Sequence, residues 1–91
     1  IDENGLCVIP FGVKTIDHRV FASNSKVRKV IMPDSVTEIK SWTFGNCHNL
    51  RAVKLSNNLK IIGSSAFASC SNLKSIKLPG DIHHRFNWWL P

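Results

Sequence analysis

The chain has 91 residues, an apolar fraction of 43% and a formal net charge of +6 at pH 7. A chain of this length forms one domain at most, and its ordinary apolar content excludes an intrinsically disordered protein. It holds no apolar run of the roughly 18 residues that cross a bilayer, and its first residues do not form a signal segment. Because it begins at Ile1 and its only methionine is Met32, we expect a fragment or a processed product. The lack of a signal segment therefore does not determine the cellular location of the parent protein.

Apolar residues recur every 23 residues along the chain. A period of this length is typical of leucine-rich solenoids, in which each coil is too small to bury its own apolar side and packs against its neighbours. The spacing predicts coils at residues 4–26, 27–49 and 50–72 and an incomplete coil from residue 73. The six columns are Phe21/Phe44/Phe67, Ile16/Ile39/Ile62, Val27/Leu50/Leu73, Cys7/Val30/Val53/Ile76, Ile9/Met32/Leu55/Leu78 and Val13/Val36/Leu59/Ile82.

Each coil is predicted to begin with a strand. In the third coil Val53 and Leu55 alternate with Ala52 and Lys54, which is the period of a strand with one buried face. Leu50 is out of phase and is expected to turn inward from the preceding bend. The strands should end where proline, which cannot donate to a continuing ladder, or a serine follows. These positions are Pro10, Pro33, Ser56 and Pro79.

A return leg is predicted after each turn, at residues 34–39 and 57–62, with the Val36/Leu59 and Ile39/Ile62 columns facing the interior. The segments 41–47 and 64–70 match each other and are too short for a stable isolated α-helix. We expect them to form helical turns.

Residues 33–39, 66–73 and 76–79 read PDSVTEI, AFASCSNL and IKLP, and they resemble the BspA-type leucine-rich repeat family. The resemblance covers about residues 5–82. It implies an extended solenoid of about three and a half 23-residue coils, with parallel strands on one face and short irregular or helical turns on the other. It also implies a cell-surface or secreted location, because the family occurs in surface or secreted proteins of bacteria and some protists with adhesion as a proposed role.

The regular repeat is predicted to end at residue 82, which divides the chain into a solenoid (1–82) and a non-repeat C-terminal cap or tail (83–91). Beyond Ile82, Arg85 occupies the slot of the isoleucine column. A terminal cap is favoured, because solenoids need their apolar ends covered. The alternatives are a truncated repeat or an apolar tail that seeks a partner chain. The apolar residues in question are Phe86, Trp88, Trp89 and Leu90.

The three cysteines, Cys7, Cys47 and Cys70, have no spacing typical of zinc ligands. We predict three buried thiols, since free cysteine packs as a small hydrophobic residue. Cys47 and Cys70 share a column, so a disulfide between neighbouring coils is the alternative.

The outer face of the strands is predicted to be basic. Arg28, Arg51 and Lys74 form one column at the strand entrance, Lys54 and Lys77 form a second, and Lys29 lies beside the first. These strands carry no matching acidic column, and like charges facing each other on a sheet are destabilising. The face is therefore a candidate ligand-binding site for an anionic partner. The alternative is that these cations only keep the sheet soluble and discourage association.

Nothing in the sequence gathers the groups of an enzyme, a metal site or a cofactor site. The histidines His18, His48, His83 and His84 lack ligand spacing, the serines lack a nucleophile motif, and the glycines are isolated. We therefore expect no catalytic residues, no metal and no cofactor. Trp42, unique to the second coil, either packs locally or anchors a partner.

The predicted function is a non-enzymatic binding or adhesion module. Its partner would be an acidic protein surface or a sulfated or sialylated glycan; nucleic acid is unlikely because the strand face lacks aromatic residues for base stacking. The alternative is a structural spacer or self-assembling segment of a longer surface protein, joined as a homo-oligomer through the solenoid ends. Solution mass separates these hypotheses, because a concentration-independent monomer excludes self-assembly.

Overall fold

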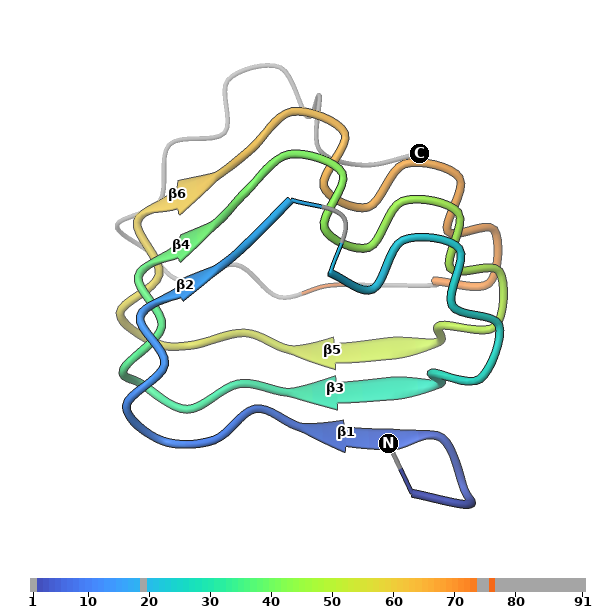
Figure 1. The fold of residues 1–91 in the computed structure, drawn as a ribbon, viewed down its shortest axis with the longest axis horizontal. Helices are drawn as coiled ribbons and strands as arrows, with labels where there is room; N and C mark the ends of the chain where they lie inside the picture. Colours follow the sequence, from blue (N-terminus) through green and yellow to red (C-terminus); the bar gives the residue numbers. More distant parts are fainter. Residues whose placement is uncertain (1, 19, 74–75, 77–91) are drawn as a thin grey trace.

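The computed structural model describes residues 2–18, 20–73 and 76, which form a parallel stack of coils (Figure 1). Each coil contributes two short strands, and each set of equivalent strands forms a three-stranded parallel sheet. The predicted C-terminal cap (83–91) lies outside the described residues. We call the sheet formed by β1 (Leu6–Val8), β3 (Lys29–Ile31) and β5 (Ala52–Lys54) sheet A, and the sheet formed by β2 (Thr15–Ile16), β4 (Glu38–Ile39) and β6 (Ile61–Ile62) sheet B.

The register of sheet A follows the repeat period, because Cys7, Val30 and Val53 pair across the three strands. Val53 and Leu55 are buried and Lys54 is exposed, which confirms the predicted alternation. Leu50 is fully buried, as expected for a residue that turns inward from the bend.

The strands of sheet A are short because the ladder ends at a residue that cannot extend it. The Ile9 N–H donates to the Ile31 carbonyl at 2.9 Å, and the Met32 N–H donates to the Lys54 carbonyl at 3.0 Å. Pro10 and Pro33 follow directly and have no N–H to donate.

Sheet B is a second parallel sheet on the return leg, where the sequence predicted inward columns but no strands. Val36, Leu59 and Ile39 are fully buried, so the predicted direction of these columns is confirmed. The extended backbone brings coils close enough to pair: the Thr37 N–H donates to the Lys14 carbonyl at 2.8 Å. Both long sides of each coil are therefore hydrogen-bonded to the next coil.

The segments that lead from sheet B back to sheet A form irregular turns. The described residues contain no helix, and so none long and apolar enough to span a membrane. A helical turn is prevented because residues with positive φ recur with the repeat. These turns also pair between coils, since the Phe44 N–H donates to the Ala66 carbonyl at 2.8 Å. The positive-φ positions are Ser23, Asn46 and Ser69 in one column and Trp42 and Ser65 in another.

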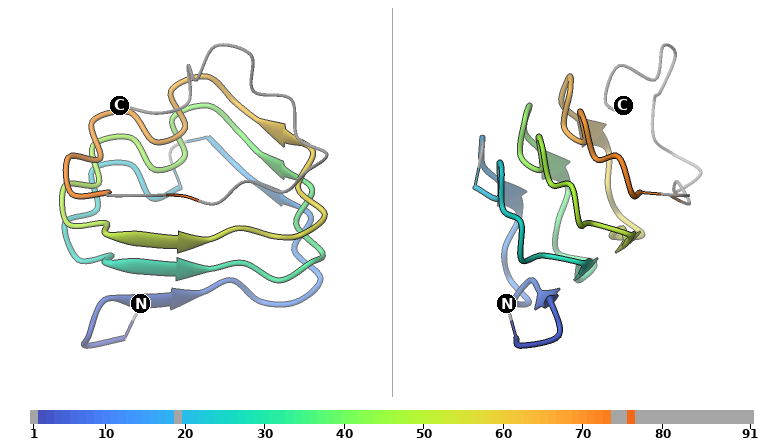
Figure 2. Two further views of the ribbon diagram at one scale, coloured as in Figure 1. Left: turned by 180° about the vertical axis from the view of Figure 1, so that it is seen from behind. Right: turned by 90° about the vertical axis from the view of Figure 1, so that its right-hand side faces the viewer.

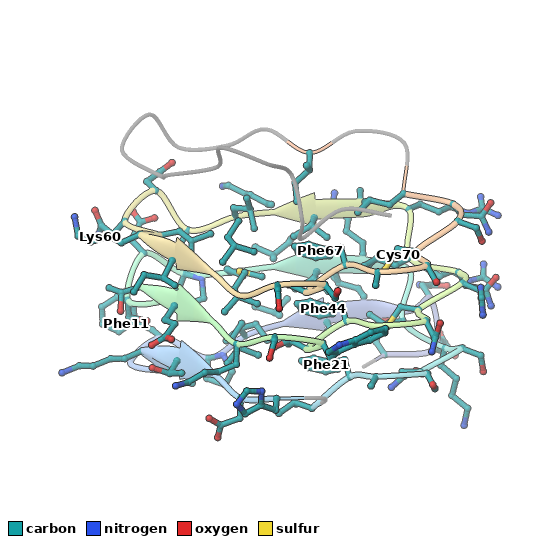
Figure 3. The ribbon with its side chains drawn as sticks, turned by 90° about the horizontal axis from the view of Figure 1, so that it is seen from above. Phe11, Phe21, Phe44, Lys60, Phe67 and Cys70 are labelled. Carbon is teal, nitrogen blue, oxygen red and sulfur yellow. The ribbon has the colours of Figure 1, made fainter. Side chains whose placement is uncertain are left out.

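The phenylalanine column forms one continuous interior, as predicted. Phe44 stacks on Phe21 with ring centroids 5.1 Å apart and on Phe67 with centroids 5.2 Å apart, and each pair is within 2° of parallel. Figure 3 shows the three rings following one another along the stack. Phe44 and Phe67 are fully buried, whereas Phe21, in the first coil, is only partly buried. The central ring thus has a stacking partner on both sides.

The first coil exposes one edge of sheet A, and Asp2 partly covers that edge. Its carboxylate accepts the Leu6 N–H at 3.0 Å, and its own N–H donates to the Leu6 carbonyl at 3.0 Å. A turn closes this arrangement, because the Gly5 N–H donates to the Asp2 carbonyl. Figure 2 shows this turn beside the stacked layers of the coils. Asp2 therefore occupies the N–H and the carbonyl of Leu6, which could otherwise pair with another strand.

All three cysteines are free and buried, so the alternative of a Cys47–Cys70 disulfide is not adopted. The Cys47 thiol donates to the Phe21 carbonyl at 2.9 Å, and the Cys70 thiol donates to the Phe44 carbonyl at 3.0 Å. The hydrogen bond with Cys47, and then burial, raise the pKa of Cys70 above its ordinary value. Burial raises the pKa of Cys7. The thiols thus belong to the core.

Replacing the central ring should destabilise the stack strongly. We expect Phe44→Ala to lower the free energy of unfolding by about 3 to 5 kcal/mol, because it creates a cavity and removes both stacking contacts. Phe11→Ala is the matched control: this side chain is 85% exposed, and its loss should change stability by less than about 0.5 kcal/mol. Urea unfolding measures both variants, and similar losses would contradict a continuous phenylalanine core.

The raised thiol pKa values predict a stability that falls as the pH rises above 9.0, the ordinary thiol pKa. Below that pH the thiols of Cys7 and Cys70 are protonated in both states. Above it the unfolded chain loses their protons while the folded chain retains them, so unfolding becomes more favourable. Urea unfolding between about pH 8 and about pH 10.5 should show a smaller decline for Cys70→Ala than for the unchanged protein. Equal declines would mean that Cys70 does not ionise differently in the two states.

Candidate functional site

Four of the predicted site residues are cations exposed at the outer face of sheet A. Arg28 and Arg51 stand side by side at the strand entrance, where the Arg51 N–H donates to the Arg28 carbonyl at 2.8 Å. Lys29 lies beside this column and pairs with Leu6 and Ala52. We call Arg28, Lys29, Arg51 and Lys54 the basic face. The other two predicted residues, Lys74 and Lys77, lie outside the described residues.

No carboxylate neutralises the basic face within the part of the chain that the structure describes. The one ion pair found there joins Lys40 Nζ to a Glu38 oxygen at 3.5 Å, on the sheet B side. Equivalent residues of adjacent coils lie about 4.8 Å apart along the stack. Arg28 and Arg51 therefore place two positive charges close together, and neither forms an ion pair with a described carboxylate, which disfavours the unliganded face.

Gly5 determines how Arg28 lies. A Cβ at Gly5 would stand 2.7 Å from Arg28 Cγ, so the stem of Arg28 packs directly on the Gly5 backbone. Gly5 also has a φ of +82°, which favours glycine independently. Arg28 thereby borders an open hollow of about 410 Å³ that also carries two carboxylates. The hollow is lined by Asp2, Glu3, Gly5, Ser25, Lys26 and Arg28.

The first coil gives the same sheet an apolar outer surface. Val8 is 60% exposed and pairs with Ile31, which in turn pairs with Lys54. The outward column thus changes from apolar to basic along the stack. A partner would meet charge mainly on the second and third coils.

Trp42 lies over Gly45 in the turn that follows β4. A Cβ at Gly45 would stand only 2.3 Å from the six-membered ring of the Trp42 indole, so glycine makes room for the ring. The equivalent turn of the third coil combines Ser65 with Ala68. Trp42 remains 37% exposed and borders a hollow of about 260 Å³ together with Ala22, Ser23 and Asn46.

His18 and Ser41 are brought together by the repeat, but they do not form an activated nucleophile. His18 Nδ1 lies 3.1 Å from the Ser41 hydroxyl oxygen and 3.3 Å from the Ser41 carbonyl oxygen. Nδ1 donates to Ser41 in one tautomer and accepts from the Ser41 hydroxyl in the other. Among the described residues no carboxylate contacts this ring, and no three potential ligands gather for a metal ion.

The sequence analysis missed two of these contacts, although the signals were present. His18 and Ser41 are separated by one period, which places them in neighbouring coils. The coil that carries Trp42 also has glycine, at position 45, in a column where the other two coils have Ala22 and Ala68. Both signals lie in pairs of columns and not in a single column.

Comparisons with known proteins agree on the architecture. A family model described as BspA type Leucine rich repeat region matches residues 6–87 in 6 copies. No curated protein matches the sequence. The chain is similar to the crystal structure of a leucine rich repeat protein from T. pallidum, with 25% identity over 90% of this chain and 41% of that one and a TM-score of 0.84.

Two further crystal structures are similar. A leucine rich cell surface protein from Faecalibacterium prausnitzii A2-165 has 38% identity over 88% of this chain and 21% of that one, with a TM-score of 0.83. A leucine-rich repeat protein from Bacteroides capillosus ATCC 29799 has 33% identity over 94% of this chain and 72% of that one, with a TM-score of 0.83. The chain thus spans less than half the length of the T. pallidum and F. prausnitzii proteins.

The fit between Trp42 and Gly45 predicts a compensating pair of substitutions. Gly45→Ala should destabilise the protein by about 1 to 3 kcal/mol, because the added methyl group displaces the indole. Adding Trp42→Ser should recover most of that loss, since the third coil already combines serine with alanine at these positions. Thermal or urea unfolding of the two single variants and the double variant gives the coupling energy. Additive effects would show that the ring does not pack on Gly45.

Proposed function

The chain belongs to the BspA-type leucine-rich repeat family, and from that premise we propose that it is a non-enzymatic binding or adhesion module whose basic face attracts an anionic partner. A cell-surface location is part of this proposal, supported by the F. prausnitzii cell surface protein to which the chain is similar.

The observation that carries the proposal is a group of four exposed cations that form no ion pair with any described residue. A net charge of +6 attracts anions over a distance of about 10 Å at moderate ionic strength. An anion that bridges Arg28 and Arg51 would relieve their mutual repulsion and receive charge-assisted hydrogen bonds. The favourable free energy of binding would come from neutralising charges that the fold already holds in place.

The partner is a protein with an acidic surface or an anionic glycan. A nucleic acid is disfavoured, because the outward residues of sheet A among those described include no aromatic side chain on which bases could stack. These residues are Leu6, Val8, Lys29, Ile31, Ala52 and Lys54.

A spacer role in a longer surface solenoid is the second candidate. It is favoured by the short span of the chain relative to two of its structural relatives. It does not require the basic face to bind anything, so measuring anion binding at that face separates the two candidates.

Binding to a heparin oligosaccharide, used as a polyanionic probe, tests the basic face. Arg51→Ser/Lys54→Ser should weaken binding about tenfold or more, because two charge-assisted contacts of on the order of 1 kcal/mol each are lost. The affinity of the unchanged protein should also fall steeply with added sodium chloride. Isothermal titration calorimetry across a salt series measures both effects.

The matched control is Lys14→Ser/Lys60→Ser, which removes two exposed charges beside sheet B. This variant should bind within about twofold of the unchanged protein. If both double variants lose the same affinity, net charge alone drives binding and the basic face is not a site. No binding by any variant would leave the spacer role as the better account.

A further inference from the structure

A second surface, separate from the basic face, combines an exposed aromatic ring with free polar groups. It is the hollow of about 260 Å³ beside Trp42, which joins the turns of the first and second coils. Ala22 and Ser23 belong to the first turn, and Trp42 and Asn46 to the second. We propose that this hollow binds the ring of an uncharged pyranose sugar.

The indole of Trp42 is held as a platform. It packs against Gly45, where even a methyl group would collide with it at 2.3 Å. The ring still leaves 37% of the residue exposed. A tryptophan that is fixed from below and open from above offers a flat apolar surface at little entropic cost, because its rotamer is already fixed.

The backbone at Trp42 makes tryptophan an unfavourable choice for packing alone. Trp42 has a φ of 59°, a left-handed conformation that is uncommon for a bulky residue. The equivalent Ser65 has a φ of 58°, so the conformation belongs to the coil and not to the tryptophan. In the third coil a small polar residue, Ser65, adopts this backbone conformation. The backbone of the coil therefore does not require tryptophan at this position.

The polar groups around the ring define the ligand class. The side chains of Ser23 and Asn46 form no hydrogen bond with any described residue, and both residues are exposed. An apolar ligand would desolvate this hydroxyl and this amide without giving them partners. The described residues that line the hollow carry no charge, which favours an uncharged ligand.

An uncharged pyranose meets both requirements at once. One side of the sugar ring presents C–H groups, which pack on an aromatic face, and its edge carries hydroxyl groups that both donate and accept. Asn46 can both donate and accept through its amide, and Ser23 through its hydroxyl. The hollow is close in size to the lower limit for small-molecule pockets, which suits one sugar ring and not a long segment.

Saturation-transfer NMR with the methyl glycosides of glucose, galactose and N-acetylglucosamine tests the proposal. We expect at least one of the three to bind the unchanged protein with a dissociation constant on the order of millimolar. Trp42→Ser should weaken that binding at least about tenfold. Gly45→Ala should do the same by displacing the ring, although alanine is compatible with the backbone in the equivalent turns of the other coils.

Two controls separate this site from other parts of the chain. Trp88→Phe/Trp89→Phe should retain sugar binding, which assigns the effect to Trp42. Arg51→Ser/Lys54→Ser should also retain it, so the loss of heparin binding and the loss of sugar binding are independent results. The proposal is overturned if none of the three glycosides binds, or if Trp42→Ser and Gly45→Ala, both folded by circular dichroism, bind as well as the unchanged protein.

Discussion

The fold depends on one constraint: each coil satisfies its backbone groups and covers its apolar side chains through the coil beside it. Sheet A, sheet B and the turns between them all donate to the adjacent coil at the same register. A slip of one residue would turn the inward columns toward solvent on the strands. The stack of Phe21, Phe44 and Phe67 requires that same register, since parallel rings about 5 Å apart cannot form if the coils are offset.

This constraint explains why so much could be predicted from the sequence. Once the period was known, neighbouring coils could be aligned by counting, and the direction of Val53, Leu50 and Val36 followed from alternation and bends. Sheet B could not be predicted, because Glu38–Ile39 and its counterparts are too short to show an alternating pattern. Short irregular or helical turns were expected, but apolar spacing does not reveal that Asn46 adopts a positive φ, which makes them irregular.

For the candidate sites, too, the repeat period predicts which residues are present but not how their side chains pack. The charge of the basic face follows from counting, whereas the packing of Arg28 on Gly5 depends on the space left by a missing Cβ. That contact places the stem of Arg28 on the backbone of the first coil. The period identifies which residues are neighbours, but it does not say how a long side chain crosses from one coil to the next.

The pairing of Trp42 with Gly45 has a consequence for how such arrays diversify. The third coil holds serine and alanine at the same two positions and keeps the same backbone conformation. Exchanging only these two residues together therefore converts a plain coil into one that displays an aromatic platform, while the hydrogen bonds to adjacent layers remain. Gene duplication followed by such paired exchanges would let a lineage change the specificity of one layer without redesigning the whole scaffold.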